Sequence, residues 1–266
     1  MRPPRSMDDE AVTDERETRP TETTIAAFVG ATGGAGTTRC TLEVATALAA
    51  DGADVGVFDA AFATQGLAAH IPGQIEPDLT ALLTEEADAP LSEGLTTLDV
   101  ETAGRVAVSP AFAPFERFAR AKTPDAAQRF ETRLSAAADR FDYVLVDVPP
   151  VASNQAIAAV NVADQSIVVA PGTTRGADAV QQMRTRLTHV GSEATLVVST
   201  RGTFEGADCD VPETDATEPE SVPSCLGDDA AFTTAIVELT AAAVGRDVSE
   251  AFEGGGLLSG VERYVK

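Results

Sequence analysis

Lysine is scarce in this chain. Lys122 and Lys266 are the only two among 266 residues, and arginine supplies the rest of the positive charge. Nonspecific binding of nucleic acid depends on clustered lysine and arginine side chains. With 19 basic residues against 42 acidic ones, the composition argues against direct nucleic-acid binding.

Metal motifs and long apolar runs are also missing. The three cysteines, Cys40, Cys209 and Cys225, form no CxxC pair, so neither a zinc site nor an iron–sulfur site is indicated. No apolar run reaches the roughly 18–20 residues of a membrane span. Residues 1–23 are polar and lack the apolar core of a secretory signal. We therefore expect a cytoplasmic protein with free thiols and a disordered tail over 1–23.

Acidic residues dominate what is present, and the formal net charge is −23. Together with the scarcity of lysine, this acidity resembles proteins of salt-in halophiles, which implies an acidic surface and an origin in a halophilic archaeon. An ordinary acidic protein from a mesophile is the alternative.

A glycine-rich stretch near the start of the chain carries the main chemical signal. An apolar run over 25–30 leads into it, and a helix pattern over 40–49 follows it. Backbone N–H groups converge on phosphate where a strand, a glycine-rich turn and a helix N-terminus meet in this order. The candidate phosphate-binding residues are Gly33, Gly34, Ala35, Gly36, Thr37, Thr38 and Arg39.

Strand and helix patterns then alternate as far as residue 245, which predicts βαβ units. The fold class is α/β: a single domain over 24–250 with a mostly parallel sheet flanked by helices. Phe112, Phe115 and Phe118 lie three residues apart, and we expect them on the core face of a short helix. The acidic stretch 202–221 is predicted to be a mobile loop.

Several of these segments resemble the MinD/ParA family of P-loop ATPases. Residues 32–39 follow the family's deviant P-loop, K-G-G-x-G-K-T-[TS], and residues 141–150 follow its Walker B strand, which ends in Asp-x-Pro-Pro. Val222 and Pro223 match the family's Ile-Pro at the end of a final short strand. The resemblance covers about 24–250. It implies a P-loop NTPase fold, ATP or ADP as ligand, and Mg²⁺ held by Thr38, Asp147 and Asp59.

Three catalytic positions depart from the family pattern. Thr37 replaces the lysine that contacts phosphate, Thr32 replaces the signature lysine that crosses a dimer interface, and Ala61 replaces the aspartate that positions water. Because catalysis of phosphoryl transfer is mostly positioning and charge stabilisation, these losses predict a pseudo-ATPase. Near the base, Thr200 replaces the family's asparagine and Arg201 retains its arginine.

Three hypotheses for function follow from the resemblance. The first is weak Mg-nucleotide binding without efficient hydrolysis, in a regulator or scaffold for spatial organisation or partitioning. The second is a nucleotide-independent interaction module on the same fold. The third is an active ATPase with relocated catalytic groups, for instance Arg39. The expected partners are proteins, in a homodimer or a heterodimer with an active MinD/ParA relative.

The C-terminal segment 251–266 also has two interpretations. Apolar residues over 257–265 share one helical face beyond a triple glycine. This pattern is typical of an amphipathic helix that contacts a membrane or a partner, which would place the protein peripherally at a membrane. The favoured alternative is a terminal segment that packs back onto the domain.

Overall fold

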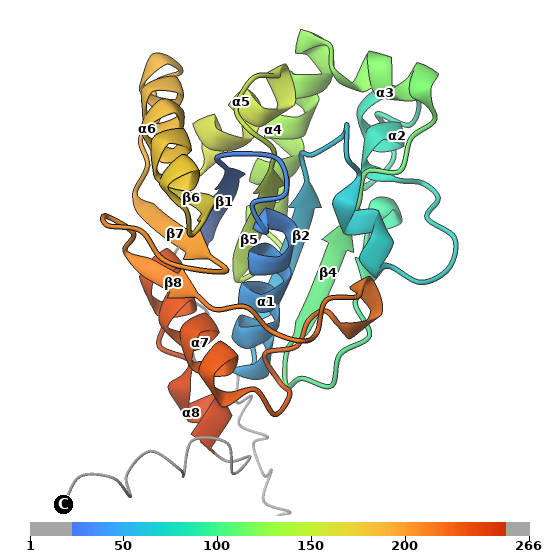
Figure 1. The fold of residues 1–266 in the computed structure, drawn as a ribbon. Coiled ribbons are helices and arrows are strands. Elements are labelled where there is room, and N and C mark those ends of the chain that lie inside the picture. Colours follow the sequence, from blue (N-terminus) through green and yellow to red (C-terminus); the bar gives the residue numbers. More distant parts are fainter. Residues whose placement is uncertain (1–22, 254–266) are drawn as a thin grey trace, which may run out of the picture.

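Eight strands form one sheet through the middle of the molecule (Figure 1). The computed structural model describes residues 23–253. The strand order is β3-β4-β2-β5-β1-β6-β7-β8, and every neighbouring pair is parallel except β3 and β4. The strands are β1 (Thr24–Gly30), β2 (Asp54–Asp59), β3 (Thr96–Thr97), β4 (Arg105–Ser109), β5 (Tyr143–Val148), β6 (Gln165–Pro171), β7 (Leu196–Thr200) and β8 (Cys209–Val211).

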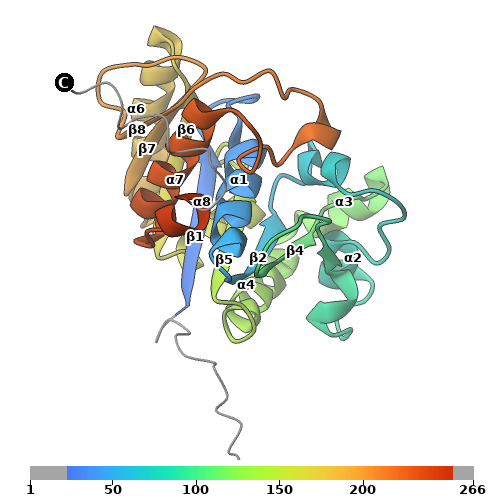
Figure 2. The same cartoon turned by 90° about the horizontal axis from the view of Figure 1, so that it is seen from below.

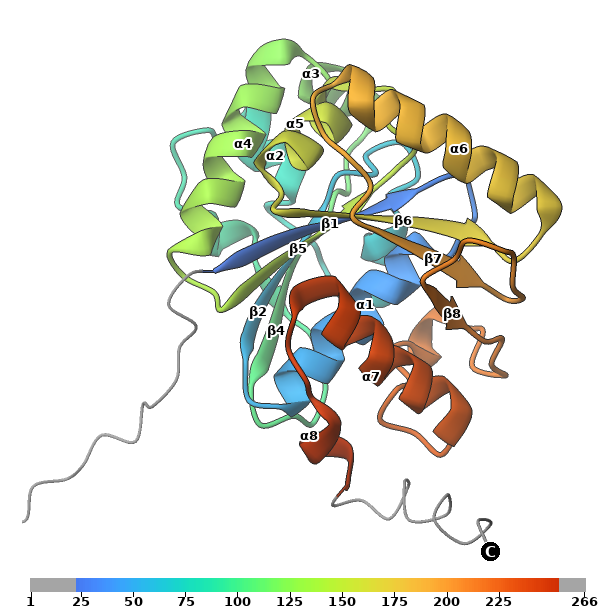
Figure 3. The same ribbon diagram turned by 90° about the vertical axis from the view of Figure 1, so that its left-hand side faces the viewer.

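Helices cover both faces of the sheet (Figure 3). On one face lie α1 (Thr37–Ala50), α7 (Ala230–Val244) and α8 (Ser249–Glu253). On the other lie α2 (Leu79–Thr84), α3 (Phe115–Ala121), α4 (Pro124–Ala138), α5 (Asn154–Val162) and α6 (Thr174–His189). Three short 3₁₀ turns, η1 (Gly66–His70), η2 (Leu91–Gly94) and η3 (Pro219–Ser221), lie in the connections.

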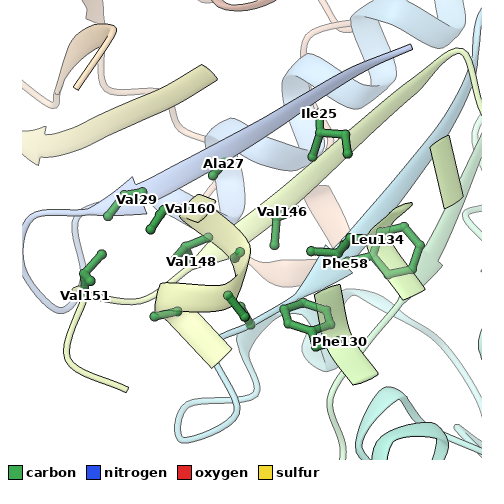
Figure 4. Close-up of a cluster of buried hydrophobic side chains, with 14 of the residues drawn as sticks. Ile25, Ala27, Val29, Phe58, Phe130, Leu134, Val146, Val148, Val151 and Val160 are labelled. Carbon is green, nitrogen blue, oxygen red and sulfur yellow. The ribbon is translucent and has the colours of Figure 1, made fainter. Parts of the chain in front are cut away.

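Two apolar cores separate the sheet from its helices, one on each face. In the first, Val146 of β5 and Phe58 of β2 point toward Phe130 and Leu134 of α4 (Figure 4). Because both faces of β1 and β5 are buried, these strands read as nearly continuous apolar runs in the sequence. The predicted single-domain α/β fold with a mostly parallel sheet is therefore confirmed.

The parallel strands fix where functional side chains can gather. Asp59 and Asp147 end β2 and β5 in matching register, beside the loop that follows β1. Both ends of the described chain, where β1 begins and α8 stops, lie at the opposite edge of the sheet (Figure 1). Candidate chemistry is thus confined to one edge.

The predicted burial of the phenylalanine stripe is wrong for two of its three members. Phe112 is 55% exposed and Phe115 is 83% exposed. The helix begins only at Phe115, after Pro114, so Phe112 lies outside it and the expected helical face never forms. Phe118 alone packs against the core.

The acidic segment 202–221 is more structured than predicted. It contains the edge strand β8, which pairs with β7, and the turn η3. Val222 and Pro223 lie beyond η3 in no strand, so the prediction of a final strand at this point is wrong. The last strand is β8, and no sequence pattern marked its three residues.

Two predicted segments fall mostly outside the described residues. The N-terminal tail is described only at Thr23, whose hydroxyl donates to the carbonyls of Ala138 and Phe141. The C-terminal segment is described only as far as Glu253, so the proposed amphipathic stretch 257–265 lies outside. Within 23–253, no helix combines the length and apolar character needed to cross a bilayer.

Candidate nucleotide site

The loop between β1 and α1 forms a cradle at the carboxyl edge of the sheet. We call residues 31–36 the glycine loop. Gly34 and Gly36 have φ angles of 71° and 92°, in the left-handed region that glycine adopts without strain. Gly36 caps α1 without a side-chain hydrogen bond, so the first N–H groups of the helix are not satisfied by a capping side chain. Such a helix start is a ready binding site for an anion.

A cavity of about 360 Å³ opens over this cradle. Thr38 and Asp147 lie at its base, and Ala61, Pro149 and His70 contribute to its walls. Residues far along the chain close one side, namely Thr217, Pro219 and Val222. The structure therefore brings the predicted loop and the predicted Walker B aspartate into one hollow.

Two buried carboxylates lie on adjacent strands here, and Asp147 contacts Thr38 and lines the cavity whereas Asp59 does not line it. Thr38 donates through Oγ1 to Oδ2 of Asp147 at 2.5 Å. Asp59 accepts from the backbone N–H of Ala61 at 2.7 Å and, more weakly, of Ala111 at 3.4 Å. Burial and the charge of Asp147 raise the pKa of Asp59 above its ordinary value. Burial also raises the pKa of Asp147, and the hydrogen bond from Thr38 opposes this rise.

These three side chains fit a magnesium ion. Carboxylate and hydroxyl oxygens are the hard donors that Mg²⁺ prefers, and Mg²⁺ usually keeps several waters and binds phosphate as well. Among residues 23–253, no cluster of three or more histidine, cysteine or acidic side chains could hold a metal by itself. Two carboxylates that disfavour joint ionisation are well matched to a cation that solvent and a phosphate also coordinate.

The two predicted base-proximal residues brace the glycine loop. Thr200 is buried and donates through Oγ1 to the carbonyl of Ala35 at 2.7 Å. Arg201 donates through Nη2 to the carbonyl of Gly34 at 2.5 Å. Both also line a second cavity of about 290 Å³ next to the first. Thr200 thus already uses its hydroxyl proton within the protein.

Arg39 lies one position beyond Thr38, and its guanidinium binds the segment that closes one side of the cavity. It forms an ion pair with Glu43 at 3.3 Å and donates to Oγ of Ser224 at 2.6 Å. A further hydrogen bond reaches the carbonyl of Ala216, and the guanidinium lies 4.9 Å from the ring centre of Phe232. Arg39 was predicted to contact phosphate, and in this structure both terminal nitrogens of its guanidinium donate to residues 216 and 224, whereas its buried Nε has no hydrogen-bond partner.

The sequence analysis missed His70 and the segment opposite it. The imidazole Nδ1 lies 3.1 Å from the carbonyl oxygen of Pro219, and burial lowers the pKa of His70. The two residues are 149 positions apart. No local pattern reports a contact over such a separation.

Comparison with known proteins identifies the family. A family model described as an AAA domain matches residues 23–197, about two thirds of the chain. The chain belongs to the AAA domain family. No curated protein matches the sequence.

Solved structures with the same fold come from MinD and ParA proteins. MinD from Pyrococcus horikoshii, complexed with Mg-ADP, superposes with a TM-score of 0.70 at 18% identity, covering 82% of this chain and 94% of that one. The ParA family ATPase from Chlorobium tepidum gives 0.68 at 14% identity, covering 82% and 98%. MinD in the MinC:MinD complex of Aquifex aeolicus gives 0.67 at 18% identity, covering 84% and 96%. Identities this low show the shared fold.

Within this AAA domain, small side chains occupy the three positions at which the sequence differs from the MinD/ParA pattern. Ala61 is buried and lines the cavity with a methyl group. Thr37 turns its hydroxyl toward Gly30, where a Cβ would lie 2.8 Å from Oγ1. Thr32 is half-buried on the cavity wall. None of the three carries a charge.

Proposed function

We propose that this protein binds Mg-nucleotide weakly at the cradle and does not hydrolyse it efficiently. The observation that carries the proposal is the distribution of charge around the cavity. Thr38 and Asp147 line the cavity and offer oxygen ligands, and Asp59 is the register partner of Asp147 on the next strand. The basic side chains that line the cavity, among residues 23–253, are Arg39 and His70. Both are held by residues 216–224.

Phosphoryl transfer needs positive charge at the transferred group and an oriented nucleophile. The glycine loop offers backbone N–H groups and the start of α1, which favour a bound phosphate in the ground state. Mg²⁺, when bound, would neutralise phosphate charge beside Thr38 and Asp147. Ala61 can neither orient a water nor accept its proton. The residues present therefore favour binding over turnover.

A role in positioning or partitioning follows from the MinD and ParA fold. In that role the chain would act as a regulator or scaffold, either as a homodimer or as the inactive partner of an active relative. The Mg-ADP bound to the Pyrococcus MinD supports nucleotide as the ligand, and the MinC:MinD complex supports a protein partner.

Thermal unfolding tests the binding proposal directly. A ligand that binds only the folded state raises Tm by mass action, and at a hundredfold excess over Kd the stabilisation is about 2.7 kcal/mol. We expect a saturable rise in Tm with Mg-ATP or Mg-ADP at millimolar concentration. We also expect the rise to disappear in Asp147→Ala and to persist in the remote control Asp164→Ala.

Hydrolysis is measured on the same preparations by phosphate release. The rate in the unmodified chain should not exceed that of Thr38→Ala. Turnover well above that level would disprove the proposal of a pseudo-ATPase and favour an active ATPase with relocated catalytic groups.

One observation favours the second candidate, a nucleotide-independent interaction module. Phe112 and Phe115 are large exposed apolar side chains, which are common at protein interfaces. Absence of any nucleotide-induced rise in Tm, combined with partner binding that Phe115→Ser abolishes, would favour this alternative.

A further inference from the structure

One segment forms a wall of both cavities. We call residues 212–225, between β8 and α7, the strap. It runs across α1 toward η1, as seen from the front and from below (Figures 1 and 2). The strap gives Thr217, Pro219 and Val222 to the cavity over the cradle. It gives Glu213, Thr214 and again Thr217 to the cavity beside Thr200. Any ligand that occupies both cavities therefore lies against the strap.

Arg39 fastens the middle of the strap to the first turn of α1. Its guanidinium donates to the carbonyl of Ala216 and to Oγ of Ser224, which bracket the residues that face the cavity. The same group stacks over Phe232 of α7, so its orientation is also fixed from the far side. The Arg39 side chain lines both cavities and lies where they meet.

Glu43, one turn further along α1, completes the attachment. Its carboxylate is fully buried and accepts hydrogen bonds from the backbone N–H groups of Ser224 at 2.9 Å and Cys225 at 2.8 Å. A buried carboxylate is costly unless it is paired and hydrogen-bonded. Arg39 provides the opposite charge at 3.3 Å. The two residues therefore act as one clamp, in which Arg39 neutralises Glu43 and both hold the strap.

The strap is also held at its end, because Val222 and Cys225 are buried in the core and Thr233 donates to the carbonyl of Cys225 at 2.9 Å. It carries Glu213, Asp215, Glu218 and Glu220 within eight residues, close to a site meant for an anion. Within this acidic part, the contact between Pro219 and His70 is one attachment, and the hydrogen bond from Arg39 to Ala216 is another.

We propose that Arg39 is a positioning residue that closes the strap over the nucleotide site and thereby sets how fast ligand enters and leaves. This inference rests on the proposed function for the identity of the ligand. The closed strap is itself a property of the free protein. The side chain next to Thr38 thus holds the wall of the site instead of contacting phosphate.

Hydrogen exchange on the full chain without nucleotide tests the clamp. Loss of the hydrogen bonds of one side chain corresponds to about 1 kcal/mol, or about five- to tenfold faster exchange where local opening is limiting. We expect this acceleration over residues 212–225 in Arg39→Gln, with β5 amides unchanged. The matched control is Arg246→Gln, which breaks the ion pair with Asp51 at the other end of α1. Equal exchange of the strap in Arg39→Gln, Arg246→Gln and the unmodified chain would overturn the proposal.

Two further variants keep the proposal testable if Arg39→Gln does not fold. Ser224→Ala removes a partner of Arg39 from the strap and leaves α1 intact, so a smaller acceleration in the same residues is expected. Arg39→Lys retains the charge beside Glu43 but cannot form the forked contact. It should restore stability to near that of the unmodified chain while the strap still exchanges faster.

Dissociation of a fluorescent Mg-ADP analogue then tests the consequence for ligand. We expect dissociation from Arg39→Gln to be about five- to tenfold faster than from the unmodified chain and from Arg246→Gln. If hydrogen exchange shows the strap to be open in Arg39→Gln but the dissociation rate of the analogue is unchanged, the proposal that the strap controls ligand exchange is wrong. Failure of the unmodified chain to bind the analogue would instead disprove the proposed function, and the exchange data would still decide the role of Arg39.

Discussion

Asp59 and Asp147 show how single residues determine the electrostatics of this site. Their carboxyl groups are almost fully buried near the ends of adjacent strands, while Arg39 binds the strap and Arg201 binds the glycine loop. Like charges in such a setting disfavour joint ionisation. Part of the stability of the free chain is therefore given up to keep a cation site.

Replacing one of these carboxylates should stabilise the free protein. In metal-free buffer at neutral pH, we expect Asp59→Asn to raise the free energy of unfolding by about 1 kcal/mol. Burial and Asp147 raise the pKa of Asp59, so folding at this pH carries the cost of protonating the carboxyl, and asparagine avoids that cost. Urea unfolding measures the difference.

The control for that prediction lies on the same strand. Asp54 is partly exposed and pairs with Arg105 at 2.9 Å. Asp54→Asn should cost about 0–1 kcal/mol, as is usual for surface ion pairs. A loss of stability in Asp59→Asn as large as that in Asp54→Asn would contradict the interpretation.

Helices α3 and α4 show how burial is decided for whole elements. Each contains phenylalanine, yet α4 buries Phe130 completely whereas α3 leaves Phe115 in solvent. The difference is length and position: α4 runs for 15 residues along the sheet, whereas α3 has seven and buries only Ala121.

Replacing these phenylalanines should destabilise the protein by different amounts in the two helices. We expect Phe130→Ala to lower the free energy of unfolding by about 3–5 kcal/mol, since it leaves a cavity in the core. Phe115→Ser should change it by about 0.5 kcal/mol or less, as is usual at the surface. Chemical unfolding of both variants measures this, and comparable losses would show that Phe115 is buried in solution.

The elements that could be predicted from the sequence are those with local signals. The runs that became β1, β5 and β6 are long and apolar, and Asp147-x-Pro-Pro marks the end of its strand. By contrast, β8 has three residues and exists only because β7 offers it an edge. The contacts of the Arg39 side chain could not be predicted either, because its partner Ser224 lies 185 residues away in the sequence. Long-range contacts of this kind leave no periodicity in the sequence.

The molecule as a whole carries a net charge of −23, and this charge should govern its response to salt. Self-repulsion destabilises the compact state. The Debye length shortens from about 10 Å at 0.1 M to about 3 Å at 1 M salt. The surface is therefore suited to high ionic strength.

We expect Tm to rise continuously with KCl over the range from about 0.1 to about 1 M. Sucrose at matched osmolality is the control, because excluded solutes also stabilise folded proteins without screening charge. A Tm that is constant or falls in KCl would contradict a stability limited by repulsion.

Both ends of the described chain leave the sheet at the edge opposite the cradle. An affinity tag, a fluorophore or a surface tether joined at residue 23 or 253 would therefore hold the molecule with the edge that carries the glycine loop turned outward. Immobilised through such a tether, the protein would present the strap and the exposed Phe115 to the solution. The proposed binding of nucleotide and of partners could then be measured without obstruction by the attachment.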